Sequence, residues 1–471
     1  MVFSSLSFLC IFLPTVLVLY RIMPSLRSKN VLLMLASLVF YAYGEPVYVL
    51  LMVASAAFNY AWALLLRADS PTPRRMVMVL AVVQNLGVLC VFKYAGWLVE
   101  SLNFATGLSV PVPQVTLPIG ISFFTFQAMS YVVDVYRGEV QPERNFVRVL
   151  LYISLFPQLI AGPIVKYHDI ADELAERSQT REGLVRGLRR FIVGLSKKVL
   201  IANYMAVVAD TMFAAPAGDV NAVGAWVGVL AYALQIYFDF SGYSDMAIGL
   251  GWMFGFHFKE NFNHPYASTS VREFWRRWHI SLSTWFRDYL YIPLGGNRKG
   301  PARAALNRII VFFLCGLWHG ANWTFVFWGL YHGFFLLLEQ YVPFFSKNGG
   351  TGRNAGRAHR AFGHAYLIIV VLVGWVFFRA DTIDQGFAWV ATMLTGWTFT
   401  PTATALVMSL LTPLNLCVFA VGCVTCLPVL DKLRGRPALE RASWVVSVVL
   451  LVLCVMSLAT GTYNPFIYFR F

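Results

Sequence analysis

Apolar runs of roughly 20 residues recur along this chain and restrict its fold more than any other feature. Charged residues make up only 13% of the sequence, against roughly 25% in an ordinary globular protein. A water-soluble fold of this length would therefore lack the charges to cover its surface. Transmembrane barrel strands need only ~9–11 residues, so runs of this length are helical. The sequence predicts an all-α polytopic membrane protein with about 11 transmembrane helices.

The basic residues, which give the chain a net charge of +14, gather in alternate loops. The loop from Arg67 to Arg75 is basic, whereas the loop from Glu100 to Pro118 has no Lys or Arg. By the positive-inside bias, the N-terminus lies outside and the first of these loops lies inside. The apolar run Leu6 to Tyr20 is expected to be a retained helix. Anionic membrane lipid, and no nucleic acid, is the expected partner of this charge.

Two stretches differ from simple spans. The apolar segment Leu150 to Ile164 is broken by Pro157 and Pro163, which predicts a re-entrant or tilted segment. Basic and Trp residues are interleaved at helical spacing from Thr269 to Arg308, which predicts an amphipathic helix in the inner interface. Since no long polar linker or internal repeat interrupts the chain, we expect a single membrane-embedded domain over residues 1–471.

The segment Gly316 to Trp323 places His319 between two apolar runs. Ionisable residues inside membrane segments are costly and mark functional sites by default. A neutral imidazole accepts a proton, and the sequence has no GxSxG or P-loop motif and no zinc-ligand spacing. We therefore expect no metal, and interpret His319 as a general base for an incoming hydroxyl. For His332, a packing role is the more common explanation.

A second group of candidates precedes these runs. Here Trp275, Arg276 and Arg277 lie just before His279, and Asn261 lies upstream. The Arg and Trp residues either anchor the membrane interface or hold a phosphate-bearing donor that arrives from the cytosol. We interpret His279 and Asn261 as residues at the entrance of that donor site.

A third group, Asp239 to Asp245, closes another apolar run. Two carboxylates and several hydroxyls occur here within seven positions, since Asp239, Ser241, Tyr243, Ser244 and Asp245 all carry them. Ser, Asp and Gly are ordinary capping residues, so a helix end and a functional site are equally good interpretations.

Several motifs together resemble the membrane-bound O-acyltransferase family. The likeness is closest to the subgroup of bacterial enzymes that acetylate alginate, cellulose or peptidoglycan. The segments that carry the resemblance are Leu117 to Phe123, Leu159 to Pro163, Tyr237 to Ala247, Phe274 to Tyr291, Gly316 to Asn322 and the C-terminal Tyr463 to Phe471.

The resemblance implies packed helices around a central funnel in a bacterial inner membrane. It implies that His319 is the catalytic residue and His279 the second important histidine, with Trp318 in the donor funnel. The donor would be cytosolic acetyl-CoA, with no permanently bound cofactor, and the acetyl group would end on an extracytoplasmic exopolysaccharide such as alginate or cellulose. Such relatives work with a periplasmic partner of the SGNH-hydrolase type, within a polysaccharide synthesis and secretion complex.

The tail of the chain raises one more hypothesis. Residues Phe466 to Phe469 are similar to the tail of the small membrane peptide in teichoic-acid D-alanylation, so Tyr468 is an acyl relay candidate; an interfacial aromatic belt is the other interpretation.

Three alternative functions of the chain remain open. They are peptidoglycan O-acetylation by the same chemistry, a proton-coupled membrane transporter, and a scaffold for the polysaccharide machinery.

Overall fold

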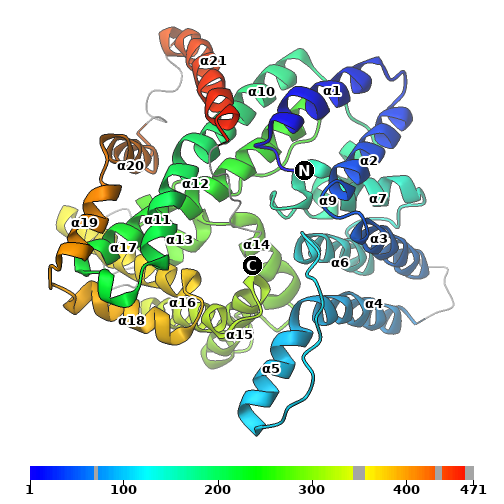
Figure 1. Cartoon of the computed structure of the whole chain (residues 1–471). Helices are drawn as coiled ribbons and strands as arrows, with labels where there is room; N and C mark the ends of the chain where they lie inside the picture. Colours follow the sequence, from blue (N-terminus) through cyan, green and yellow to red (C-terminus); the bar gives the residue numbers. More distant parts are fainter. Residues whose placement is uncertain (68–72, 343–355, 430–436, 462–471) are drawn as a thin grey trace. The chain divides into compact units, whose positions relative to one another are not determined.

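The computed structural model describes residues 1–67, 73–342, 356–429 and 437–461, and every regular element among them is helical (Figure 1). In this part of the chain, seven helices are long and apolar enough to cross a membrane. A pair of helices bent by 66°, Pro401–Leu410 and Pro413–Thr425, makes up to eight. The predicted class, an all-α multi-pass membrane protein, is confirmed. The predicted number of about 11 spans is not confirmed.

Contacts group the chain into two compact units, Met1–Ile192 with Tyr243–Glu260, and Val193–Gly242 with Asn261–Phe471. The single domain expected over residues 1–471 stays a prediction. The helices that begin in the N-terminal part of the first unit are η1 (Phe8–Phe12), α1 (Leu13–Ile22), α2 (Leu26–Ala42), α3 (Tyr48–Leu65), α4 (Arg74–Leu89), η2 (Cys90–Tyr94), α5 (Ala95–Thr106), α6 (Ile121–Arg137), α7 (Phe146–Ser154), α8 (Phe156–Leu159), α9 (Tyr167–Ala175) and α10 (Arg181–Ser196).

The other helices begin in the second unit, and α12 ends in the first. They are η3 (Lys197–Ala202), α11 (Asn203–Ala214), η4 (Ala217–Asp219), α12 (Ala222–Phe254), η5 (Pro265–Ala267), α13 (Val271–Arg277), α14 (Ile280–Phe286), η6 (Arg287–Tyr291), α15 (Pro301–His319), α16 (Trp323–Tyr341), α17 (Arg357–Arg379), α18 (Ile383–Thr395), α19 (Pro401–Leu410), α20 (Pro413–Thr425) and α21 (Pro437–Ala459).

Helix α6 forms the centre of the first unit and packs against α3 and α4 (Figure 1). All residues from Ile121 to Val135 are buried, as expected of a helix that is covered on every side. Gly138, with a φ of 76°, ends the helix in a Schellman motif: its N–H donates to the Val135 carbonyl, and the Glu139 N–H donates to the Asp134 carbonyl at 2.9 Å. This motif folds the chain after α6 back onto the last helical turn.

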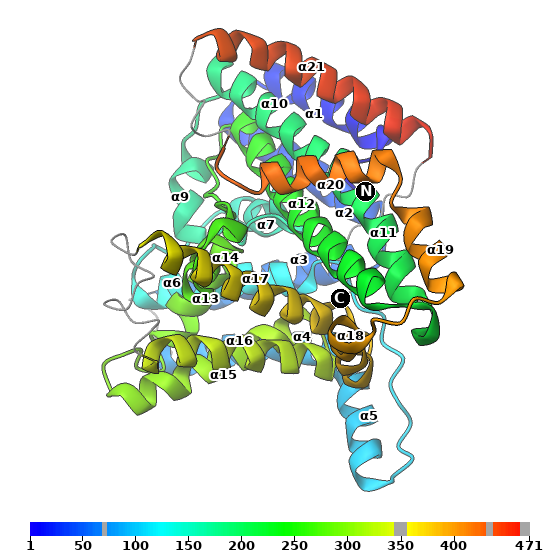
Figure 2. The same ribbon diagram turned by 90° about the vertical axis from the view of Figure 1, so that its left-hand side faces the viewer.

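Helices α15 and α16 form a closely packed hairpin in the second unit (Figure 2). Glycines allow the approach, because a Cβ at Gly316 would lie 2.2 Å from the Phe325 carbonyl oxygen, and one at Gly329 would lie 2.2 Å from that of Phe312. Neither position has room for a side chain without separating the helices. The hairpin places the end of α15 against the start of α16.

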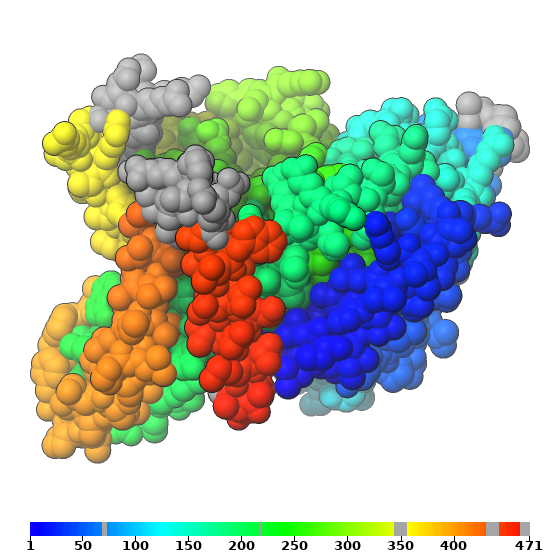
Figure 3. Space-filling model, turned by 90° about the horizontal axis from the view of Figure 1, so that it is seen from above, coloured from blue at the N-terminus to red at the C-terminus, as the bar shows by residue number. Residues whose placement is uncertain are grey.

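In contrast to the closely packed α15 and α16, helix α21 has many exposed apolar side chains. Val445, Val448, Val452 and Met456 are exposed, and the red surface of this helix stands open in Figure 3. Only 11% of its apolar window is buried inside the protein. A helix this apolar and this uncovered is expected to face lipid.

The single amphipathic helix expected between Thr269 and Arg308 is wrong. The structure divides this stretch into α13, α14, η6 and a turn before α15 begins at Pro301. The first break lies at His279, whose φ of 44° is left-handed. A residue whose backbone is in the left-handed conformation cannot continue a right-handed helix, so the chain changes direction here.

The helix end considered for Asp239 to Asp245 is also wrong, because α12 continues to Phe254. The carboxylates of Asp239 and Asp245 do not cap a helix end but pair with basic side chains. In the second unit, Lys198 Nζ lies 2.7 Å from Asp239 Oδ1, and both side chains are buried. In the first unit, Arg190 Nε donates to Asp245 Oδ1 at 2.9 Å. Pairing offsets much of the cost of burying each charge.

The segment Leu150 to Ile164 is irregular, as its two prolines predict. Helix α7 ends at Ser154, a single turn of α8 follows, and the whole segment is buried. Protein therefore covers its non-helical backbone. That it enters the membrane stays a prediction.

Candidate functional site

His319 is the last residue of α15, and the extended backbone of Gly320 follows it. The side chain is 7% exposed. Three aromatic rings surround the imidazole edge-on or nearly so: Trp318 at 5.0 Å, Trp328 at 5.1 Å and Phe378 at 5.1 Å between ring centroids. The hairpin contact at Gly316, one turn earlier, fixes the end of the helix that carries this ring. The result is a buried imidazole in an apolar, aromatic setting.

His279 lies between α13 and α14 in a strained, left-handed conformation, and its side chain is 1% exposed. Backbone strain of this kind costs ~1–3 kcal/mol and persists where the surroundings hold it. Asn261 makes several of the contacts that hold His279 in this conformation. Its Oδ1 lies 3.2 Å from His279 Nδ1 and accepts from the Ser281 N–H at 3.1 Å and hydroxyl at 2.9 Å. The Ile280 N–H donates to the Asn261 carbonyl.

The two histidines meet at Trp318. Its ring centroid lies 5.9 Å from that of His279 and 5.0 Å from that of His319. The ring of Phe240, from α12, packs nearly perpendicular to that of His279, with 4.6 Å between centroids. His279 Nε2 is buried and has no protein hydrogen-bond partner. Tertiary packing thus brings together, around one indole, two imidazoles that are 40 positions apart in the sequence. One of them keeps a ring nitrogen available for a ligand.

Burial lowers the pKa of His279 well below its ordinary value of 6.5, and the nearby His319 lowers it further. His279 lies outside the candidate membrane spans. Because the folded protein resists protonation of this ring, the imidazole is neutral at pH 7. It is then able to accept a hydrogen bond or a proton from a bound ligand.

The depressed pKa predicts a pH-dependent loss of stability. Below pH 6.5 the unfolded chain binds a proton at His279 that the folded chain excludes, so the stability present at higher pH falls as the pH falls. We expect the melting temperature of the wild type to drop further between pH 7.5 and pH 5 than that of a His279→Gln variant. Thermal unfolding of the detergent-solubilised protein measures this difference; equal drops would contradict it.

The residues predicted to hold a donor occupy three kinds of position. Asn261, Trp275 and Trp318 are buried. Arg277 forms an ion pair with Glu273 at 2.7 Å, one turn earlier on α13. Arg276 is exposed. Asn261 and Trp318 belong to the histidine site, whereas Trp275 packs against the ring of His332 at 5.2 Å. Tyr468 lies outside the described residues.

His332 and Asn322, which both follow His319 closely in the sequence, have different surroundings. His332 is 1% exposed between the rings of Trp275 and Trp328, and neither of its ring nitrogens has a protein partner. Asn322 caps α16, because its side chain accepts from the Thr324 N–H at 3.0 Å and its Nδ2 donates to the Asp381 carbonyl. Both ends of the Asn322 amide are thus occupied by the fold.

Sequence reasoning missed two of the aromatic residues that enclose the site, Trp328 of α16 and Phe378 of α17. In the sequence each is one aromatic residue among many in an apolar run, and no local pattern marks it. A third, Phe240 of α12, lies within the group Asp239 to Asp245, but nothing in that group pointed to His279. Only the packing of separate helices makes these residues neighbours of the histidines.

Comparison with known proteins agrees with the resemblance. Residues 142–379 match the model of the membrane-bound O-acyltransferase family. The chain is 45% identical to the probable alginate O-acetylase AlgI of Azotobacter vinelandii, over 84% of this chain and 79% of that protein. It is 39% identical to the probable alginate O-acetylase AlgI of Pseudomonas putida over the full length of both. A peptidoglycan O-acetyltransferase of Helicobacter pylori is 35% identical over 82% of this chain and 78% of that protein.

Proposed function

The chain belongs to the membrane-bound O-acyltransferase family, and we propose that it moves acetyl groups from cytosolic acetyl-CoA to an exopolysaccharide outside the membrane. It is an O-acyltransferase and a multi-pass membrane protein. The proposed acceptor is alginate, because the relatives from Azotobacter and Pseudomonas are named for that polymer. The proposed location is the bacterial inner membrane, with the basic loops on the cytosolic side.

The observation that carries the proposal is the pair of buried histidines around Trp318. Acyl transfer to a hydroxyl needs a base within reach of the hydroxyl proton and a site that keeps competing water away. The ring of His319, enclosed by Trp318, Trp328 and Phe378, has that character. We assign it the role of base.

In the proposed reaction the acetyl group passes directly from the thioester to a hydroxyl at His319, and in the relay described below that hydroxyl is the phenol of Tyr468. The acceptor oxygen attacks the thioester carbonyl carbon while its proton passes to His319. The C–S bond of the tetrahedral intermediate then breaks, and the departing sulfur takes the proton back from His319, so the base is regenerated. Holding both reactants in one site supplies a further part of the rate. His279 either orients the donor or shuttles a proton through its available Nε2.

The length of α15 supports transfer across the membrane. It starts beside the basic residues Arg298 and Lys299 and ends at His319. Its 19 residues correspond to ~28 Å of helix, close to the ~30 Å of a bilayer core. Arg276, exposed on α13, is the residue of the predicted donor set that is open to a phosphate group. A central funnel between the helices, through which the donor would reach His319, is also part of this proposal.

Delivery to the polymer is proposed to need a second protein. A periplasmic acetyltransferase of the SGNH-hydrolase type, within a polysaccharide synthesis and secretion complex, would take the acetyl group from this chain. Tyr468 is the proposed relay, as an ester on its phenol oxygen. Conversion of Tyr468 to Phe keeps an aromatic belt but removes that oxygen, so full acetylation by this variant would exclude the relay.

The test is complementation. A bacterium that makes alginate but lacks its own membrane O-acetylase is given this chain, and the O-acetyl content of the exported polymer is measured. We expect acetylation to be restored, and labelled acetyl from acetyl-CoA to reach the polymer in membrane preparations. Restored acetylation of peptidoglycan only, in a matching mutant strain, would move the acceptor to that polymer, as the Helicobacter relative suggests. Proton-linked transport without acetylation would support the transporter.

A further inference from the structure

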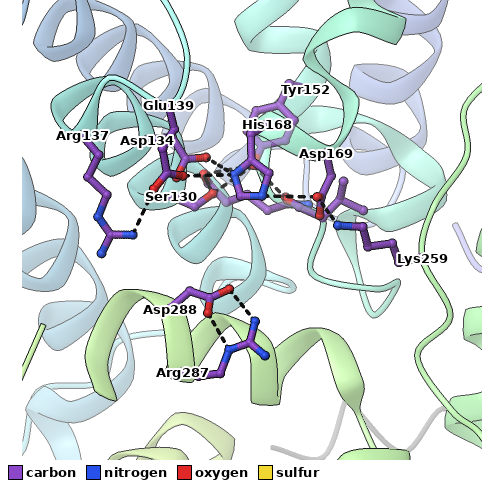
Figure 4. Close-up of polar contacts among 12 residues, drawn as sticks. Ser130, Asp134, Arg137, Glu139, Tyr152, His168, Asp169, Lys259, Arg287 and Asp288 are labelled. Atoms are coloured by element: carbon purple, nitrogen blue, oxygen red, sulfur yellow. Dashed lines mark hydrogen bonds and ion pairs between the residues drawn. The ribbon is translucent and has the colours of Figure 1, made fainter. Parts of the chain in front are cut away.

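A second cluster of chemically active side chains lies in the first unit, apart from the residues of the proposed reaction. Asp134 is on the last turns of α6, Glu139 follows the Schellman motif, and His168 is in the first turn of α9 (Figure 4). One ligand atom from each lies within 4.8 Å of the other two. From this geometry we propose that Asp134, Glu139 and His168 bind a divalent cation of the Zn²⁺ class.

The separations suit a shared metal ion. His168 Nδ1 lies 2.9 Å from Asp134 Oδ2 and 3.6 Å from Glu139 Oε2. Ligands held ~2.0–2.2 Å from one Zn²⁺ ion in tetrahedral geometry are themselves ~3.3–3.5 Å apart, and those at right angles ~2.9 Å apart. An imidazole with two carboxylates is a ligand set that zinc accepts, and the charge of the ion balances the two carboxylates. Water would complete the coordination.

The other nitrogen of the ring has the partner expected of a metal-bound histidine. His168 Nε2 faces Asp169 Oδ1 at 3.3 Å, and Lys259 Nζ pairs with the same carboxylate oxygen (Figure 4). A ligating histidine almost always donates its second ring N–H to a carboxylate, carbonyl or water, which fixes its orientation. Asp169 would therefore be a positioning residue that directs Nδ1 toward Asp134 and Glu139.

Burial and access also fit a cation site. The Asp134 side chain is 0% exposed, and a buried carboxylate requires positive charge beside it. The His168 side chain is 32% exposed, so the site opens to solvent on one side. The two oxygens of Glu139 face different partners, since Oε1 lies 3.6 Å from Arg137 and Oε2 faces His168. One oxygen is thus directed at the proposed ion.

Without a cation, a proton on His168 supplies the positive charge. Hydrogen bonding to Asp134, and then to Asp169, raises the pKa of His168 to about 9. The competing explanation of the cluster is therefore a simple ion pair between a protonated imidazole and two carboxylates. A measurement of metal binding separates the two explanations.

The test uses the full-length, detergent-solubilised protein, purified with a tag free of histidine and stripped of metal. Titration with Zn²⁺, and separately with Mn²⁺, is followed by calorimetry and by the metal content of the desalted protein. We expect one Zn²⁺ per chain, with binding at least 10-fold weaker in His168→Gln and Asp134→Asn, and ~10–100-fold weaker in Asp169→Asn. Co²⁺ in place of Zn²⁺ should give the absorption bands of a tetrahedral site.

The matched control is His257→Gln. The Nδ1 of His257 also contacts a carboxylate oxygen in this unit, Glu173 Oε1 at 2.6 Å, but His257 belongs to no three-ligand group among the described residues. It should bind Zn²⁺ as the wild type does. Equal binding by His168→Gln and the wild type, no binding by either, or an equal loss in His257→Gln would overturn the proposal. Gel filtration confirms that each variant is folded.

Discussion

Replacing His319 with glutamine is expected to lower acetyl transfer by about 10²–10⁴-fold, because the loss of a general base typically costs that much. Glutamine keeps a polar side chain of similar length between Trp318, Trp328 and Phe378, whereas alanine would add a cavity to the effect. The measurement is the initial rate at which labelled acetyl from acetyl-CoA reaches the acceptor in membranes. Protein quantity and melting temperature are measured alongside.

His332→Gln is the matched control for this variant. His332 is as buried as His319 and packs on the same indole ring, that of Trp328, at 5.1 Å. It has no assigned part in the reaction, so its variant should retain transfer within a few-fold of the wild type. Comparable losses in both variants would show that disturbed packing, rather than proton transfer, explains the result. Full activity of the His319 variant would remove it from the mechanism.

Gly329→Ala is expected to damage the α15–α16 hairpin severely. The new Cβ would lie 2.2 Å from the Phe312 carbonyl oxygen, a contact that only separation of the two helices relieves. Overpacking of this kind costs ~1–3 kcal/mol or more. Since the hairpin sets the end of α15, His319 should shift as well, and a displacement of ~1 Å can reduce a rate ~10²-fold. The melting temperature and the acetyl-transfer rate should fall together.

The control for this change lies one turn further along the same helix. At Gly333 a new Cβ would meet Ile309 Cδ1 and Phe312 Cβ at 3.3 Å, so the Ile309 methyl can turn aside and the chain at Phe312 needs to shift by only a few tenths of an ångström. Helix propensity favours alanine over glycine by ~0.8–1.0 kcal/mol. Gly333→Ala should therefore be close to neutral in stability and in activity. A Gly329→Ala variant as stable as Gly333→Ala would contradict the close packing of the hairpin.

Local sequence patterns predicted the parts of this protein that depend on one helix at a time. The apolar runs predicted an all-α membrane protein, because a chain in lipid must satisfy its backbone hydrogen bonds within each helix. The prolines in the segment Leu150 to Ile164 predicted irregular backbone, which the structure shows. The position of His319 between two apolar runs singled out the end of α15, where the structure places a close helix contact.

Patterns failed where a distant segment supplies the partner. A helix end was one of two equally good interpretations of Asp239, but Lys198 pairs with its carboxylate and α12 continues to Phe254. The predicted interfacial helix breaks at His279, whose strained conformation is held by hydrogen bonds between its Nδ1 and the side-chain oxygens of Asn261 and Ser281. The periodicity of the sequence cannot reveal these bonds. The sequence has no zinc-ligand spacing, and no metal site was expected from it. The trio Asp134, Glu139 and His168 comes from two helices and a loop that meet only in the folded chain.

The sequence by itself determined that this protein is an all-α membrane protein, because transfer of an apolar residue into lipid depends on that residue and its near neighbours. Only the tertiary structure decided which side chains meet. It brings the two imidazoles together beside Trp318, and it brings His168 together with Asp134 and Glu139. Such meetings depend on how helices far apart in the sequence pack. Packing is decided by the fit of whole surfaces, which no local pattern records.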